Sequence, residues 1–231
     1  MADIVDNAKS KKQNNPTEKV ENFMVRNRKP ILIVGICVIV AALAVCLYLG
    51  ISDSIRKKAL AEIEDIEYNY TKNFSEITDD EIATRQDTAL EALKPYLEKT
   101  NFAGVRANMI CADIYFSKKD YTNALNYYLK AAQAGEKLYT APINWYNAAV
   151  CSEELGNNSD AVAYYQSAAD FRDFTLASHA LFNAARIKEA EGNSDEAVVL
   201  YQKLVDDYSS DSWTNLGKSR LVQLRIEGKA E

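Results

Sequence analysis

The chain has 231 residues, of which 48% are hydrophobic and 26% are charged, a composition that allows one compact domain and a membrane segment. The first 30 residues carry seven Lys or Arg against four acids, whereas the remainder carries 29 acids against 20 bases. A domain this acidic repels phosphate backbones, which argues against a nucleic-acid-binding protein. The four cysteines form no CxxC and match no zinc spacing, so we expect them to act as small hydrophobic side chains.

The chain begins with a polar segment and continues into an apolar one. Residues 1–30 are rich in Asn and Lys, which predicts a short disordered tail. Residues 31–51 form an apolar run of 21 residues without a charge, close to the roughly 20 residues that cross a bilayer as a helix. The run is longer than the ~7–15 apolar residues of a signal peptide, and we therefore predict an uncleaved transmembrane helix.

Basic residues flank this run on both sides. Four precede it and three follow it, and only the first group abuts the run: Lys19, Arg26, Arg28 and Lys29 before, and Arg56, Lys57 and Lys58 after. The positive-inside rule counts residues within about 15–20 of each end. It favours an amino terminus inside and the rest of the chain outside, which is the periplasm in a bacterium with two membranes.

Two helical patterns occupy residues 52–100. Apolar residues recur at helical steps over 54–72, and an acidic helix start at Asp79 opens a second pattern that Pro95 is expected to bend or shorten. Together they predict a helical hairpin, which we also consider as a degenerate form of the repeats that follow.

Small residues and tyrosines then recur between residues 104 and 209. In each of three units two alanines are 12 residues apart and a tyrosine follows four residues later: Ala112, Ala124 and Tyr128; Ala149, Ala161 and Tyr165; Ala185, Ala197 and Tyr201. The units are offset by 37 and then 36 residues, and a period near 34 with two helices per unit is typical of a helical solenoid. We predict units over 105–135, 143–173 and 178–208, and a closing helix over 213–226.

The turn inside each unit has its own signals. We expect turns at 118–120, 156–159 and 192–194. Gly156 and Gly192 occupy equivalent places, where a left-handed conformation would end the first helix. The Asn, Ser or Asp residues after them are expected to cap the second helix.

This pattern resembles the tetratricopeptide repeat (TPR) over residues 104–226, at the alanines and tyrosines above and at Trp145. Departures are Ser152 and Lys188 where the first unit has Tyr115, and Leu204 in place of a closing alanine. The resemblance implies an all-α protein in which a transmembrane helix (31–51) and a helical hairpin (52–100) precede a TPR-type α-solenoid (101–231).

The resemblance also implies a concave surface lined by the first helix of every unit. Aromatic and Met anchors with an arginine suit an extended or unfolded segment, or a helix, of a partner protein. The alternative is that Tyr146 and Phe182 only pack against a neighbouring helix. Carried over onto this chain, the surface comprises Arg106, Met109, Asp113, Phe116, Ile143, Tyr146, Asn147, Val150, His179, Phe182, Asn183 and Arg186.

Signals for catalysis are absent from the sequence. There is one histidine, His179, no phosphate-cradling glycine loop and no nucleophile motif. The acid pairs at 153–154 and 206–207 predict a solvated helix face. We therefore predict no enzymatic activity, cofactor, metal or small-molecule substrate.

The order of segments is similar to that of the bacterial single-span, periplasmic TPR family typified by YfgM, an accessory subunit of the Sec translocon. That resemblance implies a single-pass inner-membrane protein that scaffolds secretion or envelope-assembly machinery. Two alternatives stay open: a cytoplasm-facing adaptor that recruits soluble proteins to the membrane, and a self-associating organiser of the envelope or division site.

Overall fold

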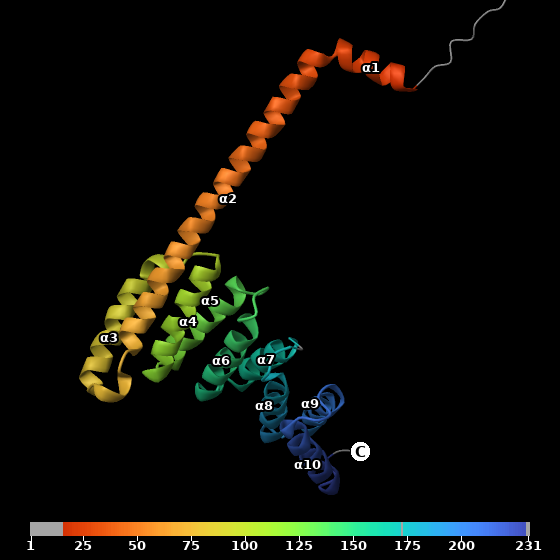
Figure 1. The fold of residues 1–231 in the computed structure, drawn as a ribbon. Coiled ribbons are helices and arrows are strands. Elements are labelled where there is room, and N and C mark those ends of the chain that lie inside the picture. The colour runs from red at the N-terminus through yellow and green to blue at the C-terminus, as the bar shows by residue number, and fades with distance from the viewer. Residues whose placement is uncertain (1–15, 172, 230–231) are drawn as a thin grey trace, which may run out of the picture. The chain divides into compact units, whose positions relative to one another are not determined.

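The computed structural model describes residues 16–171 and 173–229, and these contain ten α-helices, two 3₁₀ helices and no strand (Figure 1). The predicted all-α class is therefore confirmed. The chain divides into two compact units, Met1–Ile55 and Arg56–Glu231.

The first unit contains α1 (Pro16–Arg26) and the first part of α2 (Arg28–Thr71). Residues 16–26 were expected to be disordered, and in the structure they are helical. The physical reason is that Val20, Phe23 and Met24 follow the three- and four-residue spacing of a helix face, a signal that the polar composition conceals. Residues 1–15 lie outside the described part of the chain.

Helix α2 contains the apolar run of residues 31–51. Its most apolar stretch has a mean hydropathy of 3.0 and is 0% buried, and the helix is long enough to cross a membrane. Unpaired backbone groups are costly in lipid, and a continuous helix satisfies them internally. The structure thus contains one candidate membrane span among its described residues.

The second unit opens with a helical hairpin. The last part of α2 is followed by η1 (Phe74–Glu76), α3 (Asp79–Leu93) and η2 (Lys94–Tyr96). Ala59 and Ile63 of α2 share a buried cluster with α3 and with the helix that follows. Helix α3 ends directly before η2, which contains Pro95, because proline cannot continue the backbone hydrogen bonds of a helix.

Three helix pairs and a final helix follow. They are α4 (Phe102–Ser117) with α5 (Tyr121–Ala134), α6 (Ala141–Glu154) with α7 (Asn158–Ala169), α8 (Ala177–Ala190) with α9 (Ser194–Asp207), and α10 (Ser212–Ile226). Each helix packs on the next one along the chain, as Figure 1 shows. The helices form where the repeat pattern predicts them.

The recurring small residues form the contacts between the helices. The six repeat alanines, Ala112, Ala124, Ala149, Ala161, Ala185 and Ala197, are each 0% exposed, and the three repeat tyrosines are 1–3% exposed. A methyl side chain lets two helices approach closely, and a buried tyrosine contributes a large apolar area. The alanines and tyrosines therefore specify the stacking of the units.

The turns agree with the sequence in conformation but only partly in capping. Gly156 and Gly192 have φ values of 74° and 81°, and Lys119 takes the same left-handed region in the first unit. The Asp120 side chain caps α5 by accepting from the Asn123 amide at 3.1 Å. The expected caps at residues 157 and 193 are wrong, since neither side chain makes a capping hydrogen bond.

Candidate partner-binding surface

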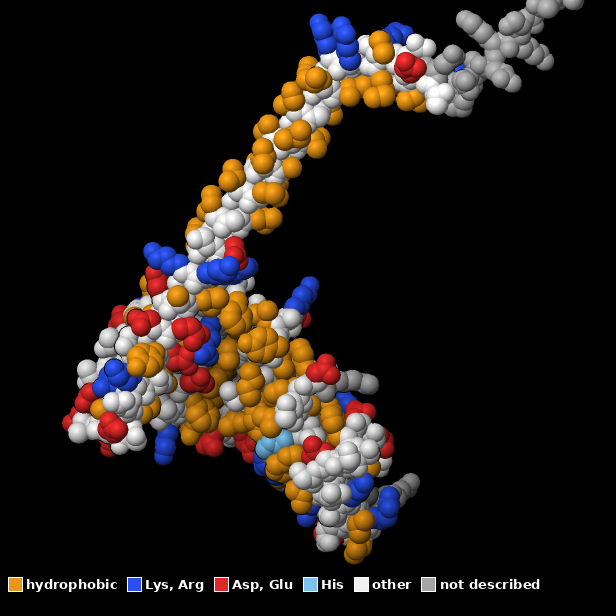
Figure 2. Space-filling view, in the orientation of Figure 1, with side chains coloured by type: hydrophobic (Ala, Val, Ile, Leu, Met, Phe, Trp, Pro, Cys, Tyr) orange, Lys and Arg blue, Asp and Glu red, His pale blue; other side chains and the backbone are white. Residues whose placement is uncertain are grey.

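The twelve residues predicted to line the concave surface, called here the first-helix surface, lie on α4, α6 and α8. Asp113 is exposed, Asn183 is buried and the other ten are half-buried. Figure 2 shows hydrophobic side chains gathered over α4 to α6. His179 lies on α8. The surface thus combines apolar side chains with polar and charged ones, and most of it is partly open to solvent.

Helix α2 supplies acidic groups at the α4 end of this surface. Arg106 Nε donates to Glu64 Oε1 at 3.2 Å, and the same guanidinium pairs with Glu67. Desolvation raises the pKa of Glu67, against the opposing effect of Arg106. Sequence reasoning named Arg106 but missed these two glutamates, because only the packed hairpin brings α2 beside α4.

Asp113 occupies an enclosed but accessible position. Tyr128 Oη donates to its carboxylate at 2.5 Å. Desolvation raises the pKa of Asp113 even though Tyr128 and Arg106 both favour its charged form. The Asp113 carboxylate is thus held by Tyr128 on one side, while the residue stays exposed to solvent on another.

The second and third units share a polar arrangement. Glu153 on α6 accepts from Tyr165 Oη at 3.2 Å and from one Arg186 nitrogen at 2.7 and 2.9 Å. Thirty-six residues later Glu189 accepts from Tyr201 Oη at 2.9 Å and from Arg220 Nε at 3.2 Å. Each acid therefore joins the tyrosine of its own unit to an arginine of the next.

This arrangement changes the interpretation of two predicted features. The expectation that the acids at 153–154 form a solvated face is wrong for Glu153, and Glu154 alone is exposed. The repeat tyrosines donate a hydrogen bond besides filling space. Desolvation and the nearby carboxylates raise the pKa of Tyr165 and Tyr201. The sequence does contain a signal for these hydrogen bonds, since each glutamate precedes the tyrosine it binds by 12 residues.

An aromatic cluster covers the α8 end of the surface. Tyr146 Oη and His179 Nδ1 are hydrogen-bonded at 2.9 Å, and the His179 ring stacks on Trp213 with centroids 3.8 Å apart. Phe182 lies 5.3 Å from the Trp213 ring. Desolvation, helped by Arg186, lowers the pKa of His179. Tyr146 and Phe182 thus pack against neighbouring helices and also stay partly exposed.

Other predicted residues are placed more separately. Asn147 is half-buried on α6, while Phe116 packs edge-on against Tyr121 with ring centroids 5.4 Å apart. Val150 contacts the core cluster of the second and third units. Met109 and Ile143 are half-buried on α4 and α6.

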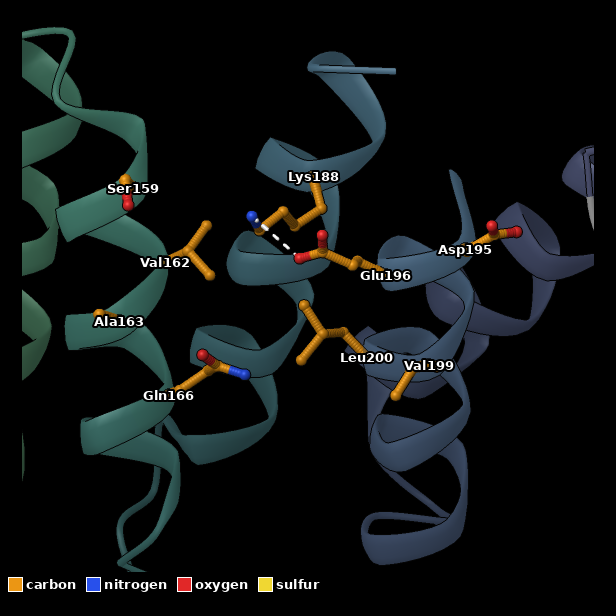
Figure 3. Close-up of a pocket in the computed structure, with 9 residues that line it drawn as sticks. All are labelled: Ser159, Val162, Ala163, Gln166, Lys188, Asp195, Glu196, Val199 and Leu200. Atoms are coloured by element: carbon orange, nitrogen blue, oxygen red, sulfur yellow. Dashed lines mark ion pairs between the residues drawn. The ribbon is translucent and has the colours of Figure 1, made fainter. Parts of the chain in front are cut away.

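A hollow lies between the second helices α7 and α9, and Lys188 of α8 also lines it (Figure 3). It has a volume of about 470 Å³ and is lined by Ser159, Val162, Ala163, Gln166, Lys188, Asp195, Glu196, Val199 and Leu200. In the first unit Tyr115 stacks on Tyr127 with centroids 5.5 Å apart. The third unit has Lys188 at the equivalent place, and its amine instead pairs with Glu196 at 3.0 Å. We call this hollow the second-helix cleft.

The described residues offer little for catalysis. They hold no group of three or more His, Cys, Asp or Glu side chains that could bind a metal. Burial raises the pKa of the Cys111 and Cys151 thiols to about 12 each, which suppresses thiolate chemistry at neutral pH. Helical-repeat folds are typically non-catalytic and present surfaces for binding.

Stacked helix pairs with a partly exposed apolar surface define the class of α-solenoid scaffolds. Within that class the repeat is the tetratricopeptide repeat, since two profiles of this family match residues 105–134 and 179–211. The chain thus contains tetratricopeptide repeats at these residues, and such repeats form a protein–protein interaction scaffold.

Known proteins share the repeat region. A TPR repeat-containing protein of Treponema pallidum (strain Nichols) is 29% identical over 150 residues, which cover 64% of this chain and 63% of that protein. The TPR-like repeats of a Podosopora anserina kinesin light chain match the fold with a TM-score of 0.54 at 12% identity, covering 74% of this chain and 87% of that one. The apo form of RapI matches with a TM-score of 0.50 at 17% identity over 70% of this chain and 51% of its own. The chain therefore spans less than two thirds of the Treponema protein and of RapI.

Proposed function

We propose that the protein is a membrane-anchored scaffold that binds partner proteins through the first-helix surface. The anchor is residues 31–51, the amino terminus lies inside, and the repeats lie on the far side of a bacterial inner membrane. In this proposal it serves protein secretion or envelope assembly as an accessory factor. The observation that carries the proposal is that one chain joins an exposed apolar helix segment to a TPR solenoid.

An anchored scaffold has a physical advantage over a soluble one. Confining the repeats near a membrane complex raises their effective concentration there, so a surface of modest affinity can still select its partner. The first-helix surface offers the groups such selection needs, because aromatic anchors supply affinity and the flanking charged residues supply orientation. Five carboxylates and three guanidiniums lie on or beside this surface, and the excess of carboxylates favours partner segments that combine apolar and basic side chains. These groups are Glu64, Glu67, Asp113, Glu153 and Glu189 with Arg106, Arg186 and Arg220.

Capture of partners by the detergent-solubilised full chain tests the binding surface. We expect Tyr146→Ala with Phe182→Ala to abolish capture while the helical circular dichroism signal is retained. Met109→Ala, which removes a half-buried side chain of the same surface, should weaken capture without disturbing the aromatic cluster. Val199→Ala is the matched control, because this 67% exposed side chain lies in the second-helix cleft instead. Loss of capture in the control alone would move the binding site to that cleft.

Cysteine labelling of intact cells tests the orientation. Thr17→Cys and Ser209→Cys place one thiol on each side of the apolar run, at exposed positions. With the repeats outside, a membrane-impermeant maleimide should label only the chain that carries Ser209→Cys. Labelling of Thr17→Cys alone would favour the cytoplasm-facing adaptor. The unmodified chain gives the background, which should be low because Cys111 and Cys151 are buried and the exposed Cys37 and Cys46 lie within the proposed membrane span, out of reach of the impermeant reagent.

The self-associating alternative has a separate measurement. Crosslinking in membranes followed by mass measurement distinguishes a homo-oligomer from a complex with other proteins. Crosslinked species at multiples of the chain mass would support the self-associating envelope organiser over the partner-binding scaffold, provided that Tyr146→Ala with Phe182→Ala leaves them unchanged.

A further inference from the structure

Helix α1 has an apolar side that it leaves exposed. Val20, Phe23 and Met24 lie at the helical spacing that puts them on one side, and they are 58%, 61% and 55% exposed. Lys19 and Arg26 fall elsewhere around the helix, and so does Val25, which points almost opposite to the apolar side. An amphipathic helix of this kind is typical of segments that lie at an interface.

The chain places α1 close to the candidate span. Only Asn27 separates α1 from α2, and the backbone hydrogen bonds Asn27 N to Phe23 O and Ile31 N to Asn27 O, at 2.9 and 3.0 Å, continue across it. The five residue-to-residue steps from Arg26 to Ile31 cover ~7–8 Å as helix. The headgroup layer on each side of a bilayer is about 5–8 Å thick. If residues 31–51 span the membrane, the carboxyl end of α1 at Arg26 therefore lies within that layer.

Basic side chains are concentrated at the same depth. Arg26, Arg28 and Lys29 lie between the apolar side of α1 and the apolar run. Juxtamembrane Lys and Arg are attracted to anionic lipids. The two observations point to a single occupant of this surface, since the apolar side fits acyl chains and the cations fit phosphate headgroups.

We propose that α1 lies along the membrane surface, with Val20, Phe23 and Met24 in the acyl-chain boundary and the three basic residues on anionic lipid headgroups. This inference rests on the proposed anchor. Helix α1 then provides a second membrane contact, on the leaflet that faces the amino terminus. This contact lies in the plane of the bilayer, and its strength depends on the charge of the lipids.

The test is amide hydrogen exchange of the full chain reconstituted into phosphatidylcholine vesicles with and without phosphatidylglycerol. We expect amides 20–26 to exchange about tenfold more slowly in vesicles that contain phosphatidylglycerol. Phe23→Asn with Met24→Asn should remove that protection. Val25→Asn is the matched control, because it places the same residue type in the same helix on the opposite side, and it should keep the protection.

The outcomes separate the two proposals. Equal exchange in the unmodified chain and in the Phe23→Asn, Met24→Asn chain overturns the interfacial helix while the anchor stands. Protection that is the same with and without phosphatidylglycerol overturns the anionic-lipid contact. A chain that does not float with the vesicles at all overturns the anchor, and the interfacial helix falls with it.

Discussion

Replacing Tyr165 by Phe removes one oxygen atom from the core of the second unit. The side chain is 2% exposed, and its hydroxyl donates to Glu153 Oε2 at 3.2 Å. The ring and its packing stay in place, so the substitution isolates the hydrogen bond that joins α7 to α6. It asks whether the repeat tyrosine acts through its hydroxyl as well as its ring.

The structure sets the expected magnitude. A hydrogen bond to a charged group contributes about 1.5–3 kcal/mol to stability. Glu153 keeps two contacts to Arg186, at 2.7 and 2.9 Å, and its side chain is 30% exposed, so the loss should lie near the lower limit. We expect about 1–1.5 kcal/mol, which corresponds to about 3–5 °C in Tm for a domain of this size.

Thermal unfolding of the full chain in detergent, followed by circular dichroism at 222 nm, measures the effect. Tyr164→Phe is the matched control, since this neighbouring ring packs on Trp145 at 5.6 Å, and its Tm should change little. Tyr165→Phe combined with Arg186→Ala should cost more than the two single changes added, because Glu153 then loses both partners. If Tyr165→Phe matches Tyr164→Phe in Tm, the hydroxyl contributes nothing and the tyrosine only fills space.

Three further predictions concern individual residues and their immediate surroundings. His179 is the one histidine, and NMR titration should give it a pKa below the usual value of about 6.5. The free energy of unfolding should then fall as the pH drops from about 6.5 toward the pKa of the folded state, because the unfolded chain binds the proton more readily. Arg186→Ala should raise the pKa of His179, because a nearby cation is removed. Asp113→Asn should raise Tm at neutral pH, because the folded state favours the protonated form of this acid. The gain in Tm should vanish below about pH 4, where the aspartate is protonated in the unfolded chain as well. An unchanged Tm at both pH values would contradict this prediction. Gly104→Ala should destabilise by about 1–3 kcal/mol in denaturant unfolding, since its new Cβ would lie 1.7 Å from the Lys99 carbonyl oxygen, and a stabilisation of the size usual for Gly→Ala in a helix would refute that contact.

The helices of the solenoid were predictable because their signal repeats. An alanine that must be small and a tyrosine that must be large recur at nearly constant spacing, so each unit supports the assignment of the others. Helix α1 has no such support. Its apolar side consists of Val20, Phe23 and Met24 within a polar segment, and composition outweighed spacing in the prediction.

The candidate surface was predictable as a set of positions but not as a set of contacts. The repeat register places Tyr146 and Arg186 on first helices, and the structure agrees. Their partners depend on how neighbouring units pack, and Arg186 meets Glu153 across 33 residues of sequence. Trp213 on His179 was missed for the same reason, because α10 lies outside the three complete units.

The third unit contains both charged groups, an arginine and a glutamate, that link neighbouring units. Its Arg186 binds the acid of the unit before it, and its Glu189 binds Arg220 of the helix after it. A tandem copy of this unit would find a matching acid on one side and a matching base on the other. In-frame duplication of this unit can therefore lengthen the solenoid, because each added interface would be held by the same pairing of glutamate and arginine as the existing ones.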